Sequence, residues 1–134
     1  MKEFNYYQPT EIRFGQGRLE ELGEAVGRYG INCLLVTVPE IPEFSGLFRR
    51  AKKILKDKGI NVVHFDGVIP NPTVEVVAKG ANLAKYNQVE VVVGLGGGST
   101  MDTAKAIAVE ATHPGNCWDY IFSSESQPTE KTLP

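Results

Sequence analysis

The chain has 134 residues, of which 42% are hydrophobic and 22% charged, and its formal net charge is −2. These values suit one globular domain, and the lack of a basic stripe argues against nucleic acid as the main partner. No apolar run approaches the roughly 20 residues that span a bilayer, and the polar, aromatic start does not resemble a signal peptide, so we expect a cytoplasmic protein without a membrane partner.

The first predicted element is an N-terminal β-hairpin. Its two short extended stretches are residues 4–7 and 11–14, and residues 8–10, which include a proline, can turn the chain between them. Apolar residues at helical spacing then predict a helix over residues 19–29, which Gly30 ends.

Three alternations of a buried strand and an amphipathic helix follow. The strands are predicted where short, almost wholly apolar runs are bounded by breaking residues, over 32–38, 60–65 and 90–95. The helices are predicted over 44–58, 73–86 and 99–111, with Thr73 as an N-cap. This order is typical of an α/β fold, a Rossmann-like parallel sheet flanked by helices.

The remaining residues do not continue the alternation of strands and helices. Residues 113–116 are a cluster of helix breakers, and residues 117–122 are expected to form a short helix or a packed loop. Residues 123–134 are polar, contain two prolines and are expected to be irregular. In parallel α/β sheets, ligands bind beyond the carboxyl ends of the strands, so the loops after Val38, Phe65 and Leu95 are the candidate site loops.

The loop after the third strand contains Gly96, Gly97, Gly98 and Ser99. Glycines let a phosphate approach the backbone, and a helix start presents N–H groups and the positive end of its dipole. Ser99 is the predicted N-cap, and Asp102 would complete a capping-box-like pair; either could contact a ligand as well. The spacing matches neither the dinucleotide fingerprint nor the P-loop, so it predicts a phosphate-sized anion site. A tight turn without a ligand is the alternative.

The loop after the second strand places Asn71 between Pro70 and Pro72. The two prolines restrict the backbone, so the Asn71 amide could make a fixed hydrogen bond to a ligand. A rigid turn before the next helix explains the same residues equally well.

The loop after the first strand begins with Thr37 and Val38. In nucleotide-binding sheets this strand end faces the adenosine ribose, and an acidic residue there favours NAD over NADP. Val38 is uncharged and Glu40 follows two residues later, so the sequence leaves the choice between NAD and NADP open.

Residues that could hold a metal are scattered. Cys33, Cys117, His64 and His113 have no ligand-pair spacing, so we assign neither a metal ligand nor a catalytic residue to this chain. Cys33 is expected to be a buried apolar filler.

Several segments resemble one known family. Residues 96–106, GGGSTMDTAKA, resemble the GGGSxxDxAKA motif of the iron-containing (group III) alcohol dehydrogenases. Residues 65–73, FDGVIPNPT, are similar to a second motif of that family, and residues 4–7 and 12–17 to its beginning. Residues 117–120, CWDY, resemble the butanol dehydrogenase-like branch.

The resemblance implies a dehydroquinate synthase-like N-terminal domain that binds NAD or NADP. It implies that Gly97, Gly98 and Ser99 contact the cofactor pyrophosphate, with Asp102 nearby and Asn71 at the cleft. Many members have an aspartate where Val38 stands here, which keeps NADP possible.

The family also has a C-terminal helical domain, in which an aspartate and three histidines bind Fe²⁺ or Zn²⁺. We therefore expect residues 1–134 to be the dinucleotide-binding domain only, a catalytically inactive fragment of an oxidoreductase that interconverts a primary alcohol and its aldehyde. An unpaired sheet edge would favour a homo-oligomer or aggregation. The alternatives are a stand-alone nucleotide- or phosphate-binding module and a purely structural domain.

Overall fold

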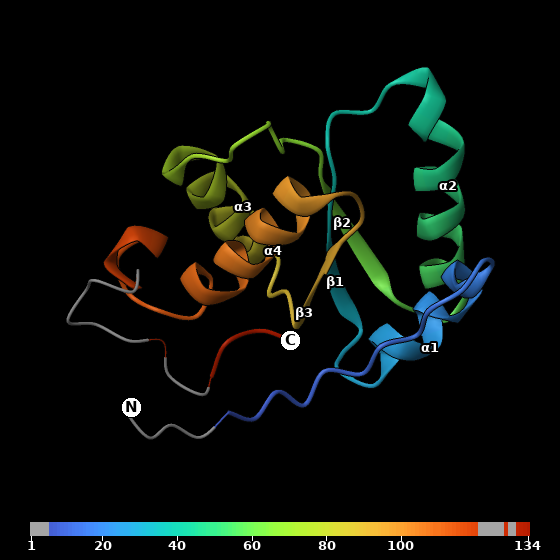
Figure 1. Cartoon of the computed structure of the whole chain (residues 1–134), viewed down its shortest axis with the longest axis horizontal. Coiled ribbons are helices and arrows are strands. Elements are labelled where there is room, and N and C mark those ends of the chain that lie inside the picture. Colours follow the sequence, from blue (N-terminus) through green and yellow to red (C-terminus); the bar gives the residue numbers. More distant parts are fainter. Residues whose placement is uncertain (1–5, 121–127, 129–130) are drawn as a thin grey trace.

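The computed structural model describes residues 6–120, 128 and 131–134 (Figure 1). Short 3-10 helices are labelled η. In chain order the elements are η1 Arg18–Glu21, α1 Leu22–Gly27, β1 Asn32–Val36, α2 Pro42–Asp57, β2 Asn61–Phe65, α3 Val74–Tyr86, β3 Val91–Gly94, α4 Gly98–Glu110 and η2 Cys117–Tyr120.

The three strands form one parallel sheet in the order β2-β1-β3. In its register Leu34 of β1 lies beside Val63 of β2 on one side and Val92 of β3 on the other. Residues 33–36 of the central strand are completely buried. A strand covered on both faces has no polar alternation, which is why residues 33–36 of β1 are all apolar. The predicted parallel α/β fold is confirmed.

Helices cover both faces of the sheet (Figure 1). Leu34 and Val36 point to one face, where they pack in a cluster with residues of α3 and α4 that include Val77 and Ile107. Cys33 points to the other face and packs with residues of α1 and α2, which confirms its expected role as an apolar filler. The successive strand residues therefore serve two separate cores. No helix of the described residues is both long and apolar enough to cross a membrane.

The predicted N-terminal hairpin is wrong in its second arm. The described residues contain no strand before Asn32; residues 4 and 5 of the first arm lie outside the described part of the chain. A two-stranded hairpin on its own is only marginally stable, and here residues 11–13 are held by side-chain ion pairs instead. The predicted helix over residues 19–29 is split into η1 and α1 and ends at Gly27.

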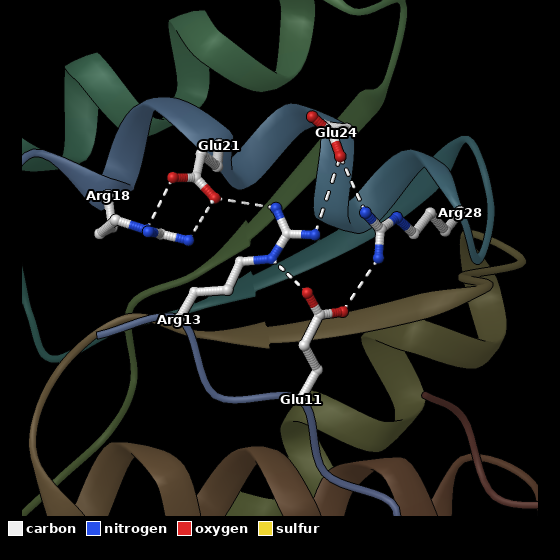
Figure 2. Close-up of polar contacts among 6 residues, drawn as sticks. All are labelled: Glu11, Arg13, Arg18, Glu21, Glu24 and Arg28. Carbon is white, nitrogen blue, oxygen red and sulfur yellow. Dashed lines mark hydrogen bonds and ion pairs between the residues drawn. The ribbon is translucent and has the colours of Figure 1, made fainter. Parts of the chain in front are cut away.

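An ion-pair network attaches the N-terminal segment to η1 and α1 (Figure 2). Arg13 lies 2.6 Å from Glu11 and 2.9 Å from Glu21, and its side chain is only 21% exposed. Arg28 lies 2.9 Å from Glu11. The full network consists of Glu11, Arg13, Arg18, Glu21, Glu24 and Arg28.

The end of the chain is described only in part. Residues 117–120 form η2, as the short-helix alternative predicts. Residues 121 and 122 of that prediction lie outside the described residues, as does most of the predicted irregular segment.

Candidate functional site

The three candidate loops meet at the carboxyl edge of the sheet (Figure 1). Backbone hydrogen bonds hold them together. The Leu95 N–H donates to the Val36 carbonyl at 2.9 Å, and the Thr37 N–H donates to the Phe65 carbonyl at 2.9 Å. The Thr37 carbonyl in turn accepts from the Val68 N–H at 3.2 Å. One edge of a rigid sheet thus positions all three loops.

The glycine loop opens directly into α4. Gly96, Gly97 and Gly98 are exposed, and Ser99 is half-buried. Gly97 is the N-cap residue, with φ −88° and ψ −163°, and no side chain caps the helix among the described residues. The N–H groups of Thr100 and Met101 both donate to the Gly97 carbonyl at 3.1 Å.

The prediction that Ser99 is the N-cap and pairs with Asp102 is therefore wrong. Gly97 adopts the extended conformation and its carbonyl accepts the first helical bonds, so the helix begins one residue earlier than predicted. Asp102 instead lies on the exposed surface, where its carboxylate is 3.8 Å from the Lys105 ammonium. Within the described part of the chain, no side chain caps the first N–H groups of α4, which a helix leaves without intrahelical partners.

The glycines in and just before this loop fall into two groups, one in crowded and one in open surroundings. A Cβ atom at Gly96 would lie 2.4 Å from Thr100 Oγ1, and one at Gly94 would lie 3.1 Å from the Ala104 Cβ. These two positions allow close packing between the strand, the loop and α4. A Cβ at Gly97 or Gly98 would meet no described atom within 4 Å. A tight turn therefore accounts for Gly96, but Gly97 and Gly98 leave accessible backbone facing open space.

The first turn of α4 is fixed from its buried side. Thr100 and Thr103 are almost completely buried, and the Thr103 hydroxyl donates to the Ser99 carbonyl at 2.7 Å. The helix is 13 residues long, so the aligned peptide dipoles place partial positive charge at this exposed start. This arrangement suits a phosphate or another small anion.

Asn71 has a left-handed backbone conformation, with φ 51°. Asparagine tolerates this region better than most residues, and the flanking Pro70 and Pro72 restrict its movement. Its exposed side chain makes no hydrogen bond with the described residues, so the amide is available to a ligand. Thr73 is the N-cap residue of α3, as predicted, but its side chain makes no capping hydrogen bond; it lowers the pKa of the Glu75 carboxyl instead.

Thr37 follows the last residue of β1 and is buried at the carboxyl edge of the sheet. Its completely buried hydroxyl donates to the Val38 carbonyl at 2.7 Å and is 2.9 Å from Nε2 of His64. The His64 ring packs edge-on against Phe48. Burial, followed by the charge of Lys52, lowers the pKa of His64. The Thr37 side chain thus stabilises the start of the loop after β1 through its hydrogen bond to the Val38 carbonyl.

His64 was not among the candidate site residues. The sequence places it on a strand, but only the register, which sets Leu35 beside His64, brings its ring to the Thr37 hydroxyl. Val38 is half-buried and packs against the cluster on the α3 and α4 face.

Potential metal ligands are dispersed in the described residues. Within the described ranges, no three histidine, cysteine, aspartate or glutamate residues lie close enough together to hold a metal ion. Burial raises the pKa of the Cys33 thiol to about 12, so it is a poor source of a thiolate ligand. The described residues do not fit the metal that the resemblance implies.

The chain is similar in sequence and structure to known proteins. The family model for iron-containing alcohol dehydrogenase matches residues 9–134. A probable NADH-dependent butanol dehydrogenase of Bacillus subtilis is 40% identical over 125 residues, which are 93% of this chain and 32% of that relative.

Solved structures agree with the family match. The NADH-dependent butanol dehydrogenase A of Thermotoga maritima superimposes with a TM-score of 0.87 at 36% identity, over all of this chain and 33% of that protein. The sulfoacetaldehyde reductase of Bifidobacterium kashiwanohense, solved in complex with NAD⁺, gives a TM-score of 0.81 at 29% identity, over all of this chain and 35% of that protein.

The chain thus spans about a third of the length of these relatives. The family model covers residues 9–134, which include the glycine loop. The solved relatives share the fold of the chain. The chain belongs to the iron-containing alcohol dehydrogenase family.

Proposed function

We propose that this chain binds the pyrophosphate of NAD or NADP at the start of α4 and is the dinucleotide-binding part of an alcohol dehydrogenase. The N–H groups of Gly97, Gly98 and Ser99 hold the phosphate oxygens. Asn71 donates a hydrogen bond from the neighbouring loop, and Asp102 lies on the exposed face of the following turn.

The observation that carries this proposal is the open space at Gly97 and Gly98. Both glycines can take a Cβ without touching a described atom, so packing of the protein does not explain them. They stand at the uncapped start of a 13-residue helix, where a bound diphosphate gains from both the N–H groups and the dipole. A relative with the same fold was solved with NAD⁺ bound.

The ribose end of the cofactor lies over Val38, supported by Thr37. Because Val38 carries no charge, it neither accepts a hydrogen bond from a ribose 2′-hydroxyl nor repels a 2′-phosphate. We therefore propose that both NAD and NADP are bound. The complete enzyme would interconvert a primary alcohol and its aldehyde, the metal being held by residues other than those described here.

Titration with NADH and NADPH tests the proposal. Calorimetry with the purified chain should show one site for each dinucleotide, and ADP should compete because it supplies the same diphosphate. Binding of inorganic phosphate without either dinucleotide would instead favour a general phosphate-binding module. If none of these compounds binds, the result would favour a purely structural domain.

A further inference from the structure

Thr37 is the first residue after β1, and each of its polar atoms has a partner. Its N–H donates to the Phe65 carbonyl at 2.9 Å, and its carbonyl accepts from the Val68 N–H at 3.2 Å. Its hydroxyl donates to the Val38 carbonyl at 2.7 Å and lies 2.9 Å from Nε2 of His64. Because the Thr37 side chain is completely buried, these bonds are shielded from solvent. Strand β2 and the loop after it therefore hold the start of the loop that leads to α2.

These hydrogen bonds determine which nitrogen of His64 carries a hydrogen. A hydroxyl has one hydrogen, and the Thr37 hydroxyl donates it to the Val38 carbonyl, so this hydroxyl can only accept from His64. Nε2 must therefore donate. Burial, followed by the charge of Lys52, lowers the pKa of His64, although nearby carboxylates act in the opposite direction. The ring is thus neutral above pH 7, with its single hydrogen on Nε2.

The His64 ring is held between α2 and the loop after β1. In the register of the sheet, His64 lies beside Leu35 of the central strand. Its ring packs edge-on against Phe48 of α2, with the ring centroids 5.9 Å apart. Packing on one side and the bond to Thr37 on the other fix the direction in which Nε2 points.

We propose that His64 is a positioning residue for the adenosine end of the dinucleotide site, a role that rests on the proposed function, in which the ribose lies over Val38. His64 donates to the Thr37 hydroxyl, which donates in turn to the Val38 carbonyl and so fixes the backbone next to the ribose. His64 acts through Thr37 and does not itself contact the cofactor.

The direction of the two hydrogen bonds is essential to this role. If the side chain at position 64 were an acceptor, the Thr37 hydroxyl would turn its hydrogen towards that side chain. The Val38 carbonyl would then lose its partner, and a polar group left unpaired in the protein is costly, so the loop would shift. The diphosphate is held elsewhere, at the start of α4. We therefore expect a defect that is confined to ligands containing adenosine.

Calorimetry with ADP and with inorganic pyrophosphate separates the two ends of the site. His64→Glu places an acceptor beside Thr37, and His64→Gln is the matched control, because it has the same shape and can still donate an N–H. His64→Glu should weaken ADP binding by about fivefold, the factor expected for one hydrogen bond of ordinary strength, and should change pyrophosphate binding by less than about twofold. His64→Gln should bind both ligands like the unaltered chain.

A double-mutant cycle excludes a direct effect of the new charge. Thr37→Val removes the hydroxyl at similar size and should weaken ADP binding by about the same factor as His64→Glu. In a chain that already carries Thr37→Val, His64→Glu should cause no further loss, because its carboxylate finds no hydroxyl to attract. Additive losses would show that the carboxylate acts on the ligand itself and would overturn the proposal.

The tautomer of His64 can be observed without any substitution. At pH 8, a long-range ¹H–¹⁵N spectrum of the unaltered chain should show the hydrogen of the His64 ring on Nε2. A hydrogen on Nδ1 would overturn the proposal.

The binding measurements also distinguish this role from the proposed function. If the unaltered chain binds neither ADP nor pyrophosphate, nucleotide binding at the start of α4 is refuted, and the role of His64 with it. If it binds both, but His64→Glu binds ADP as tightly as His64→Gln does, only the role of His64 is refuted. Equal losses of ADP and pyrophosphate binding in His64→Glu would likewise refute a role confined to the adenosine end.

Discussion

We propose that nucleotide binding depends on Gly97 and Gly98. Their neighbour Gly96 lacks a side chain because Thr100 occupies the adjacent space. Gly97 and Gly98 have no such neighbour, and Gly97 has φ −88°, a value that any residue adopts. We therefore propose that the absence of side chains at these two positions leaves room for a ligand.

A matched pair of glycine substitutions separates binding from folding. Gly98 begins α4 and Gly46 lies inside α2, and a Cβ at either meets no described atom within 4 Å. Alanine at a helical glycine stabilises by roughly 0.5–1 kcal/mol, so neither Gly98→Ala nor Gly46→Ala should lower the melting temperature. Only Gly98→Ala should weaken NADH binding, by about tenfold, or 1.4 kcal/mol. Equal affinities of the two variants in calorimetry would argue against contact at Gly98.

The order of strands and helices could be predicted from the sequence. Short apolar runs identify β1, β2 and β3. The central strand β1 is buried on both faces, which favours apolar residues, whereas the edge strand β2 also contains Asn61 and His64. The observed strands are shorter than predicted at one or both ends; Thr37 and Leu95, for example, belong to the predicted strands but lie just beyond the observed ones.

Local details could not be predicted because they depend on tertiary contacts. Ser99 has the residue type of an N-cap, but Gly97 takes the extended conformation and the helix begins earlier. Residues 11–14 have the alternation of a strand, but no strand precedes Asn32 in the described part of the chain. The contact between His64 and Thr37 follows from strand register, which a single sequence does not reveal.

The close approach of the glycine loop to α4 can be tested by substitution. Alanine at position 96 would press on Thr100, which is 1% exposed and cannot move aside. We expect Gly96→Ala to lower the free energy of unfolding by about 1–3 kcal/mol, as overpacked sites do. Gly97→Ala is the control and should unfold like the unaltered chain in urea. A destabilisation shared by both variants would show that the loop is packed differently.

At the scale of the whole molecule, the chain is the part of the family fold that carries the glycine loop. It covers about a third of its relatives, and the described residues hold no group of three metal-binding side chains. We therefore propose that binding of a cofactor can be separated experimentally from turnover of an alcohol.

We expect the chain to bind NADH without oxidising it. An assay with NADH, butanal and added Fe²⁺ or Zn²⁺ should show no loss of NADH absorbance, because hydride transfer needs a substrate held against the nicotinamide. A full-length butanol dehydrogenase serves as the positive control. Steady turnover by the purified chain would contradict this expectation.

The contact between the cofactor and the start of α4 can be observed residue by residue. In ¹⁵N-labelled protein, addition of NADH should shift the amide resonances of Gly97, Gly98 and Ser99 more than any others, with smaller changes at Asn71 and Val38. ADP should reproduce the shifts at the glycines, since it carries the same diphosphate. If NADH binds while these three amides stay unchanged, the dinucleotide lies elsewhere and the start of α4 is not its binding site.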